Sequence, residues 1–291
     1  MTPSTLPSAQ LLPFPRSGAL PPAVATVVVP CYNEAARLNV GAYLDFLSAS
    51  RAVDLVFVDD GSTDATLEVL SQIHAAYPGR VEVLSLERNC GKAEAVRRGL
   101  QYAAQGKVGF VGYWDADLAT PLEAIEDFLS VGRRFAEVEV IFGARRMMLG
   151  HRVTRSLTRR TVSRLCAALA RGAVRLPVGD TQCGAKLLRN TPALIEALRE
   201  PFHAGWLFDV ELFTRIARTL RRPRTGFYEL PLAEWTEVAG SKIDGRAILR
   251  SGLTMLRLIA EIRLGLPRDT ARTPSARLVV RPVPPAGMGT V

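Results

Sequence analysis

The sequence has few cysteines and no CxxC pair. Its four cysteines, Cys31, Cys90, Cys166 and Cys183, are widely spaced in a chain of 291 residues. This spacing argues against a zinc cluster and against a disulfide framework. The composition also excludes the collagen-like, coiled-coil and disulfide-scaffold classes.

Long hydrophobic runs are missing as well. The longest apolar stretch with a helical pattern, 248–264, contains three arginines and a glutamate, whereas a membrane-spanning helix needs about 20 mostly apolar residues. The first 22 residues hold six prolines and a single charge, Arg16. They lack the basic start and apolar block of a secretory signal. We therefore expect a cytoplasmic protein.

The charge is unbalanced toward the basic side. Lys and Arg number 37 against 28 Asp and Glu, a net charge of +9, which favours anionic partners. Residues 151–175 hold seven arginines and no acid. Such a run is commonly a solvated helix face, but its density favours docking on an anionic membrane surface. No helix-turn-helix, zinc or aromatic RNA-binding signature accompanies the charge, so we expect no nucleic-acid partner.

Short apolar segments alternate with helical patterns in the first half. Alternation of this kind predicts a doubly wound α/β domain. The predicted strands are 25–29, 54–58, 81–86, 108–114 and 138–142, and the predicted helices are 34–49, 63–77, 92–104 and 121–135.

The remainder divides into segments of different character. We expect loose tails at 1–22 and 265–291, where prolines are frequent and periodicity is absent. One domain spans 23–245, with a nucleotide half at 23–145 and an acceptor half at 146–245. A basic helix is predicted at 151–175, and an amphipathic helix at 246–264.

The sharpest chemical feature is a pair of carboxylates at the end of a predicted strand. Asp115 and Asp117 follow Trp114, and residues two apart in an extended chain point to the same side. Ligands of open α/β sheets bind at the carboxyl ends of the strands. The pair therefore suits Mg²⁺ or Mn²⁺ bound with a diphosphate. A solvated acidic turn is the competing interpretation.

Three more strand ends carry polar groups. The sequence Asp-Asp-Gly-Ser-Thr-Asp at 59–64 contains helix caps, but capping does not easily explain Asp59, which could accept from a base or ribose. Residues 30–34, Pro-Cys-Tyr-Asn-Glu, read as a turn and a helix start. Residues 89–92, Asn-Cys-Gly-Lys, could hold a phosphate at a helix N-terminus, although the P-loop spacing GxxxxGK is absent.

Taken in order, these motifs resemble the family 2 glycosyltransferases. The matching segments are VVVPCYNEAARL (27–38), VFVDDGSTDATLEVL (56–70), LERNCGKAEAVRRGL (86–100) and GYWDADLATPLEAI (112–125). Four later segments look like dolichyl-phosphate glucosyltransferases and related polyprenyl-phosphate enzymes: GDTQCGAKLLR (179–189), GWLFDVEL (205–212), LPLAEW (230–235) and GSK (240–242). The resemblance covers about residues 25–262.

The resemblance implies a Rossmann-like GT-A fold with a mixed, mainly parallel sheet and C-terminal amphipathic helices. It also implies a metal-dependent, inverting hexosyltransferase that moves a hexose from a nucleotide-sugar donor to a polyprenyl or dolichyl phosphate. We expect glucose from UDP-glucose. A GDP-mannose enzyme, a transferase with a soluble or polysaccharide acceptor, and a basic binding protein that keeps only the fold are the alternatives.

Carried over by position, the resemblance also assigns roles to residues. The nucleotide site would comprise Pro30, Tyr32, Glu34, Asp59, Asp60 and Lys92. The catalytic set would comprise Asp115, Asp117, Asp209 and Glu211, with the metal on Asp117 and Asp115. The phosphate and acceptor side would comprise Arg145, Gln182, Trp206, Ser241 and Lys242.

Two positions depart from the family pattern. Ala144 stands where serine is usual, and Ala119 stands where relatives can place a polar metal ligand. Water or another residue would then complete the metal shell. Many relatives also carry transmembrane segments, whereas no segment of this sequence has that pattern. From its basic stretch at 151–175 we expect the chain to act peripherally on the inner membrane face.

Overall fold

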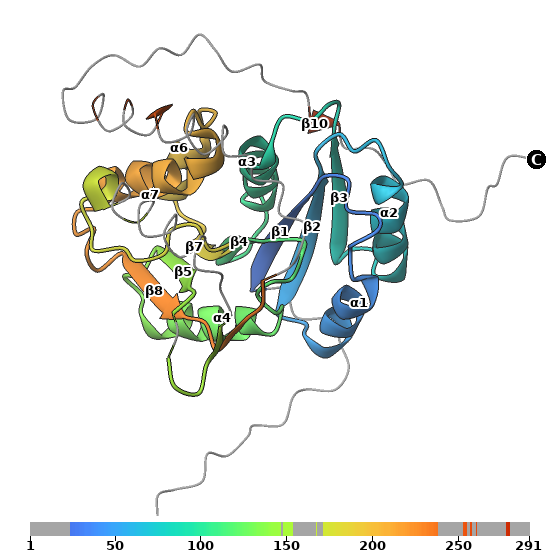
Figure 1. Cartoon of the computed structure of the whole chain (residues 1–291), viewed down its shortest axis with the longest axis horizontal. Coiled ribbons are helices and arrows are strands. Elements are labelled where there is room, and N and C mark those ends of the chain that lie inside the picture. The colour runs from blue at the N-terminus through green and yellow to red at the C-terminus, as the bar shows by residue number, and fades with distance from the viewer. Residues whose placement is uncertain are drawn as a thin grey trace, which may run out of the picture.

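A mixed sheet of eight strands runs through the protein (Figure 1). The structure is a computed structural model, which describes residues 24–146, 148–153, 167, 171–237, 253, 254, 257, 260 and 278–279. The strands are β1 (Ala25–Cys31), β2 (Val53–Asp59), β3 (Val81–Leu86), β4 (Phe110–Trp114), β5 (Val140–Ala144), β7 (Ala185–Arg189), β8 (Phe227–Pro231) and β10 (Leu278–Val279). Across the sheet they follow the order β10-β3-β2-β1-β4-β7-β5-β8.

Most neighbouring strands are parallel, and β7 is the exception inside the sheet. It pairs antiparallel with β4 on one side and with β5 on the other. At the far edge, β10 pairs antiparallel with β3. The mixed, mainly parallel sheet predicted from the sequence is therefore confirmed.

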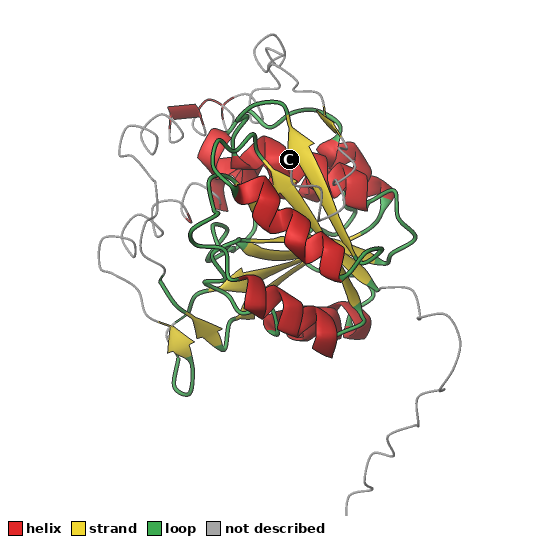
Figure 2. Ribbon diagram, turned by 90° about the vertical axis from the view of Figure 1, so that its right-hand side faces the viewer, coloured by secondary structure: helices red, strands yellow, loops and turns green. Residues whose placement is uncertain are grey.

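Helices cover both faces of the sheet (Figure 2). They are α1 (Val40–Ala49), α2 (Thr66–Ala76), α3 (Lys92–Ala103), α4 (Ala124–Arg134), α6 (Pro192–Leu198) and α7 (Phe208–Thr219), with a 3₁₀ turn η1 at Gly205–Leu207. One core joins the sheet to α3, α6 and α7, and a second joins it to α1, α2 and α4.

The strand pattern explains why two cores form. Successive side chains of a strand point to opposite faces. In β1, Val28 therefore belongs to the core with α3, whereas Val27 and Val29 belong to the core with α1 and α2. Because both faces of such a strand are buried, its sequence is a continuous apolar run.

Three predicted helices begin later than the sequence indicated, and α1 shows the reason. It begins at Val40 rather than at Glu34, capped by the Asn39 side chain, which accepts from the Ala42 amide at 3.1 Å. The amides of Glu34 and Ala35 donate instead to the Thr66 hydroxyl, at 2.8 and 3.1 Å. The residues before α1 therefore form a turn tied to the loop after β2. Likewise α2 begins at residue 66 and α4 at residue 124.

The second half differs from the sequence prediction at two places. The predicted basic helix begins with a strand, β6 (Arg152–Val153), which pairs parallel with β9 (Glu234–Trp235). Residues 171–174 are helical as predicted, and the stretch between lies largely outside the described residues. Within the tail predicted at 265–291, residues 278–279 form β10.

The amphipathic helix predicted at 246–264 lies outside the described residues, except for 253, 254, 257 and 260, which are helical. Among the helices of the described ranges, none is long and apolar enough to cross a membrane.

The contact between α3 and the sheet has a testable consequence at Gly99. A Cβ there would lie 2.3 Å from Val28 Cγ1 and 2.8 Å from Val58 Cγ2. We expect Gly99→Ala to lower the free energy of unfolding by about 1–3 kcal/mol through overpacking. Gly41→Ala in α1 is the matched control, since its Cβ would meet only Asn39 Oδ1 at 3.6 Å. Urea denaturation with equal midpoints for both variants would contradict the prediction.

Candidate functional site

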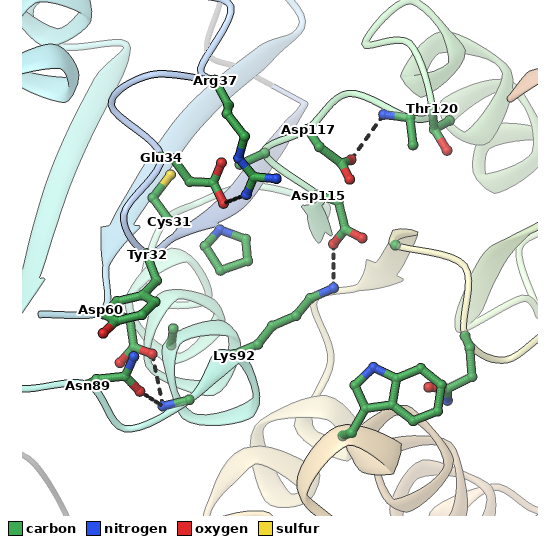
Figure 3. A pocket seen from close by; sticks show the side chains of 18 of the residues that line it. Cys31, Tyr32, Glu34, Arg37, Asp60, Asn89, Lys92, Asp115, Asp117 and Thr120 are labelled. Carbon is green, nitrogen blue, oxygen red and sulfur yellow. Dashed lines mark hydrogen bonds and ion pairs between the residues drawn. The ribbon is translucent and has the colours of Figure 1, made fainter. Parts of the chain in front are cut away.

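A cavity of about 490 Å³ opens at the carboxyl edge of the parallel strands (Figure 3). Residues that follow β1, β2, β3, β4 and β5 line it. Because β7 is antiparallel, its amino end lies at the same edge, and Gln182 and Gly184 line the cavity from there. The remaining wall comes from Trp206 in η1 and Trp235 in β9.

The two carboxylates of the Asp-Ala-Asp motif both line this cavity. Asp115 Oδ1 lies 2.5 Å from Lys92 Nζ, and the Asp115 amide donates to the Gly184 carbonyl at 2.9 Å. Gly184 has to be a glycine, since a Cβ there would lie 1.9 Å from Asp115 Oδ2. The close approach of β7 thus fixes where this carboxylate sits.

Asp117 has one oxygen engaged by the chain. Its Oδ1 accepts from the Ala119 amide at 3.1 Å. Burial and the nearby negative charge of Asp115 raise the pKa of the Asp117 carboxyl. A cation between two such carboxylates would relieve their repulsion, and hard divalent cations prefer oxygen ligands. Within the described ranges, no group of three or more His, Cys, Asp or Glu side chains could hold a metal alone.

The two adjacent aspartates Asp59 and Asp60 differ in position, since Asp60 lines the cavity and Asp59 does not. Asp59 is buried, with Oδ1 accepting from the Ser62 amide at 3.1 Å and Oδ2 from the Ser85 hydroxyl at 3.3 Å. It is a turn cap outside the cavity lining. Asp60 does line the cavity, and its two oxygens accept from the Cys90 and Gly91 amides, both at 2.8 Å.

The first strand end contributes Pro30, Tyr32 and Glu34, all of which line the cavity. Glu34 Oε1 lies 2.5 Å from Arg37 Nη2, and Figure 3 shows this pair beside the two aspartates. Arg37 is a lining residue that the sequence interpretation missed. Its place in the segment NEAARL, three residues after Glu34, was the available signal.

Arg145 reaches the cavity with its guanidinium held in place. Its Nε and Nη2 donate to the two carboxylate oxygens of Asp180, each at 2.7 Å. The guanidinium also lies 5.3 Å from the centre of the Trp235 ring. Sequence reasoning identified neither Asp180 nor Trp235 as a partner of Arg145, because both come from distant segments.

A second cavity of about 340 Å³ shares Gly91, Lys92, Gln182 and Trp206 with the first. Asp209 lines it together with two aromatic residues, Phe202 and Phe208. Gln182 and Trp206, predicted on the acceptor side, therefore line the same cavity as Asp209 of the predicted catalytic set. Its aromatic walls and the buried Asp209 carboxylate suit a ligand with both apolar faces and hydroxyl groups.

Glu211, predicted as a catalytic residue beside Asp209, faces away from both cavities. Its Oε2 accepts from the His203 and Ala204 amides at 2.8 and 2.9 Å, and its Oε1 lies 2.6 Å from Arg215 Nη2. It is almost fully buried and fastens the turn before α7. Residues two apart on a helix point in different directions, and of the two carboxylates only Asp209 lines either of these cavities.

Two predicted residues and two that were not predicted remain to be placed. Ser241 and Lys242 lie outside the described residues. Asn89 and Thr120 line the first cavity although the predicted site did not include them. Asn89 lies within the Asn-Cys-Gly-Lys segment that the sequence did single out, whereas Thr120 carried no separate signal.

Comparisons with known proteins agree with this geometry. Residues 26–191 match the sequence profile of "Glycosyl transferase family 2". The dolichyl-phosphate beta-glucosyltransferase of Mus musculus is 34% identical over 75% of this chain and 69% of its own length. That of Saccharomyces cerevisiae is 29% identical over 85% of this chain and 77% of its own length.

Solved structures show the same fold. Glucosyl-3-phosphoglycerate synthase from Mycobacterium tuberculosis in complex with UDP has a TM-score of 0.60 at 20% identity, covering 85% of this chain and 82% of that one. The same enzyme in complex with Mn²⁺, UDP and glucosyl-3-phosphoglycerate has a TM-score of 0.58 at 18% identity, covering 89% and 88%.

Asp60 gives the site a measurable pH response. Burial raises its pKa from 3.8 to about 6, although the Cys90 and Gly91 amides oppose the shift. The folded chain thus binds this proton more tightly than the unfolded chain, so Asp60 removes stability as the pH rises from about 4 to about 6. We expect the NMR shifts of both amides to titrate near pH 6. Flat shifts between pH 5 and 7, or an inflection retained in Asp60→Asn, would refute this.

Proposed function

The chain belongs to glycosyl transferase family 2 and is a hexosyltransferase, and we propose that it transfers glucose from UDP-glucose to a polyprenyl phosphate. The GT-A-like fold that the resemblance implied is present in the sheet and its helices. The observation that carries the proposal is the meeting of Asp115, Asp117, Lys92 and Arg145 in one cavity. Relatives that match most of this chain are named for glucosyl transfer to dolichyl phosphate.

The first cavity would hold the nucleotide diphosphate. Pro30, Tyr32 and Glu34 would surround the nucleoside, and Asp60 would support them by holding the Asn89–Gly91 turn. Lys92 would face the diphosphate. Its ammonium already lies against Asp115, so cation and carboxylate are placed before the ligand arrives. Preorganised charge of this kind needs little rearrangement during the reaction.

Asp115 and Asp117 fit a divalent cation, Mg²⁺ or Mn²⁺. Burial and the nearby charge of Asp115 raise the pKa of Asp117, and Gly184 leaves space for the Asp115 carboxylate; both features suit a bound cation. A cation held there would neutralise the negative charge that develops on the leaving diphosphate. Ala119 offers no side-chain oxygen for a cation. Asp115 and Asp117 are therefore the side-chain ligands that residues 115–119 supply.

The acceptor phosphate needs cations more than it needs a base. The second pKa of a phosphate monoester is about 6, so at neutral pH the acceptor is already mostly a dianion. Its oxygen would attack the anomeric carbon while the bond to the nucleotide diphosphate breaks, which inverts that centre. Arg145, held by Asp180 at the cavity, would offset the repulsion between the two anions. Asp209 would orient the hexose from the second cavity.

The reaction is tested with purified protein, Mn²⁺ or Mg²⁺, a short polyprenyl phosphate, and radiolabelled UDP-glucose or GDP-mannose in parallel. We expect label to enter the organic phase from UDP-glucose, with kcat at least about 100-fold lower in Asp117→Ala because the cation site is lost. Asp127→Ala is the matched control, since Asp127 is an exposed aspartate of α4 far from the cavity lining.

Other outcomes of this assay would replace the proposal. Label from GDP-mannose alone would make the chain a mannosyltransferase. Slow nucleotide release that needs Asp117, without organic-phase label, would remove the lipid acceptor. Failure to bind Mn²⁺ and nucleotide would leave a binding protein that keeps only the fold.

A lipid acceptor also requires contact with a membrane surface, and the turn after β5 supports this. Leu149 is fully exposed and Met148 is half exposed. Arg146 beside them has 56% of its side chain exposed while it pairs with Glu229 at 3.3 Å. Exposed apolar and basic side chains in one turn suit an anionic lipid surface. We therefore place the chain peripherally at the membrane.

Vesicle flotation tests this placement. We expect the protein to float with vesicles that contain anionic lipid at 0.15 M salt and to be released at about 1 M salt, where charge attraction is screened. Leu149→Ser should weaken binding severalfold. Ile195→Ser is the control, because Ile195 is an exposed apolar side chain on α6. Equal flotation of both variants, or flotation with neutral vesicles alone, would contradict the placement.

A further inference from the structure

Near the two cavities lies a buried lysine, Lys186, to which neither the sequence analysis nor the proposed reaction assigns a role. Lys186 in β7 has no solvent exposure and pairs in register with Tyr113 in β4. A lysine is rarely buried in this way, because removing its charge from water is costly unless its partners compensate. Its three contacts are therefore informative.

All three N–H donors of the Lys186 ammonium are used. Nζ lies 2.8 Å from the Tyr113 hydroxyl, 2.5 Å from the Cys183 carbonyl and 3.2 Å from Asp209 Oδ1. A neutral amine has only two N–H groups, so three acceptors around one nitrogen select the charged form. The rings of Tyr113 and Phe213 face the same ammonium, with centroids 4.9 and 5.8 Å away.

The same contacts determine the state of Asp209. The Tyr113 hydroxyl accepts from Lys186 and donates to Asp209 Oδ1, so Oδ1 receives two donors from the protein. Burial raises the pKa of Asp209, and the Lys186 charge and the Tyr113 hydroxyl oppose this rise by favouring the carboxylate form. No described residue donates to Oδ2, and Asp209 lines the second cavity. One carboxylate oxygen is thus available to a ligand.

The side-chain amide of Gln182 indicates which ligand would suit Asp209 Oδ2. Gln182 lines both cavities, and its buried Nε2 has no acceptor among the described residues. A hydroxyl group can donate to Asp209 and accept from Gln182, whereas a phosphate would be repelled by the carboxylate. The second cavity therefore suits the neutral, hydroxyl-bearing hexose rather than either phosphate.

We propose that Lys186, with Tyr113, is a positioning residue that holds Asp209 as an oriented carboxylate for a hydroxyl of the transferred hexose. The inference rests on the proposed function, since it concerns the hexose of the same reaction. It deepens that function by separating two tasks. The first cavity would bind the diphosphate through cations. The second would recognise the sugar through the Asp209 carboxylate, whose charged form the buried Lys186 ammonium stabilises.

The test compares Lys186→Met with wild type in three measurements: UDP and UDP-glucose binding by calorimetry, kcat and KM for transfer, and the pH dependence of kcat. We expect UDP affinity within about twofold of wild type, because Lys186 does not touch the first cavity. We expect kcat at pH 7 to fall at least 100-fold. It should recover in part toward pH 9, because loss of Lys186 raises the pKa of Asp209 and only higher pH restores the carboxylate.

To assign the pH profile to Asp209, the other titratable groups around it have to be distinguished from it. Those that face it or share its cavity are Tyr113, Lys186, Lys92, Glu94 and Cys90. All five except Lys186 are unchanged in the variant, so a recovery absent from wild type reports the missing ammonium. Arg215→Met is the matched control. It removes a buried cation from α7, the helix that carries Asp209, where Arg215 pairs with Glu211. It should lower stability without a recovery at high pH.

A milder variant keeps the test decisive if Lys186→Met does not fold. Tyr113→Phe removes one of the two donors to Asp209 Oδ1 and keeps the ring, and we expect kcat about tenfold lower with UDP affinity unchanged. Folded Lys186→Met or Tyr113→Phe with wild-type kcat would overturn the inference alone. Wild-type protein that binds UDP but transfers no hexose would overturn the proposed function and this inference with it.

Discussion

The antiparallel strand β7 between β4 and β5 is the constraint on which the site depends. Its reversed direction brings its amino end to the edge where the parallel strands have their carboxyl ends. Gly184 then lies against Asp115, and Gln182 stands between the two cavities. Lys186, two residues further along β7, points beneath them to Tyr113 and Asp209. One strand thus positions residues of both cavities.

The site balances charges that would be unfavourable separately. Asp115 is paired with Lys92, Arg145 with Asp180, and Asp209 with Lys186. Each pair joins residues from different elements, and the Lys186–Asp209 pair is almost fully buried, where removing either partner would leave an uncompensated charge. Asp117 differs, because burial and Asp115 raise its pKa and its Oδ1 accepts from the Ala119 amide. Family membership and this uncompensated carboxylate both suit a bound divalent cation.

Sequence patterns predicted elements better than the roles of single acids. The alternation of apolar runs and helical stretches placed β1 to β5 and α1 to α4 within a few residues, because buried parallel strands and amphipathic helices have distinct periodicities. The late start of α1 was not predicted, since the amides of Glu34 and Ala35 bond to Thr66, about thirty residues away. Strand β7 was missed, because its buried Lys186 breaks the apolar run expected of an interior strand.

The sequence by itself determined the family, the α/β class and the loops that gather at the sheet edge, because these depend on local periodicity and on motifs read in order. Which acid in each motif lines a cavity was decided only by the tertiary structure. Asp59 and Asp60 are adjacent, and Asp209 and Glu211 are two apart, yet one of each pair caps a turn and the other lines a cavity. The amides and cations that make this choice come from distant segments, so no local pattern contains it.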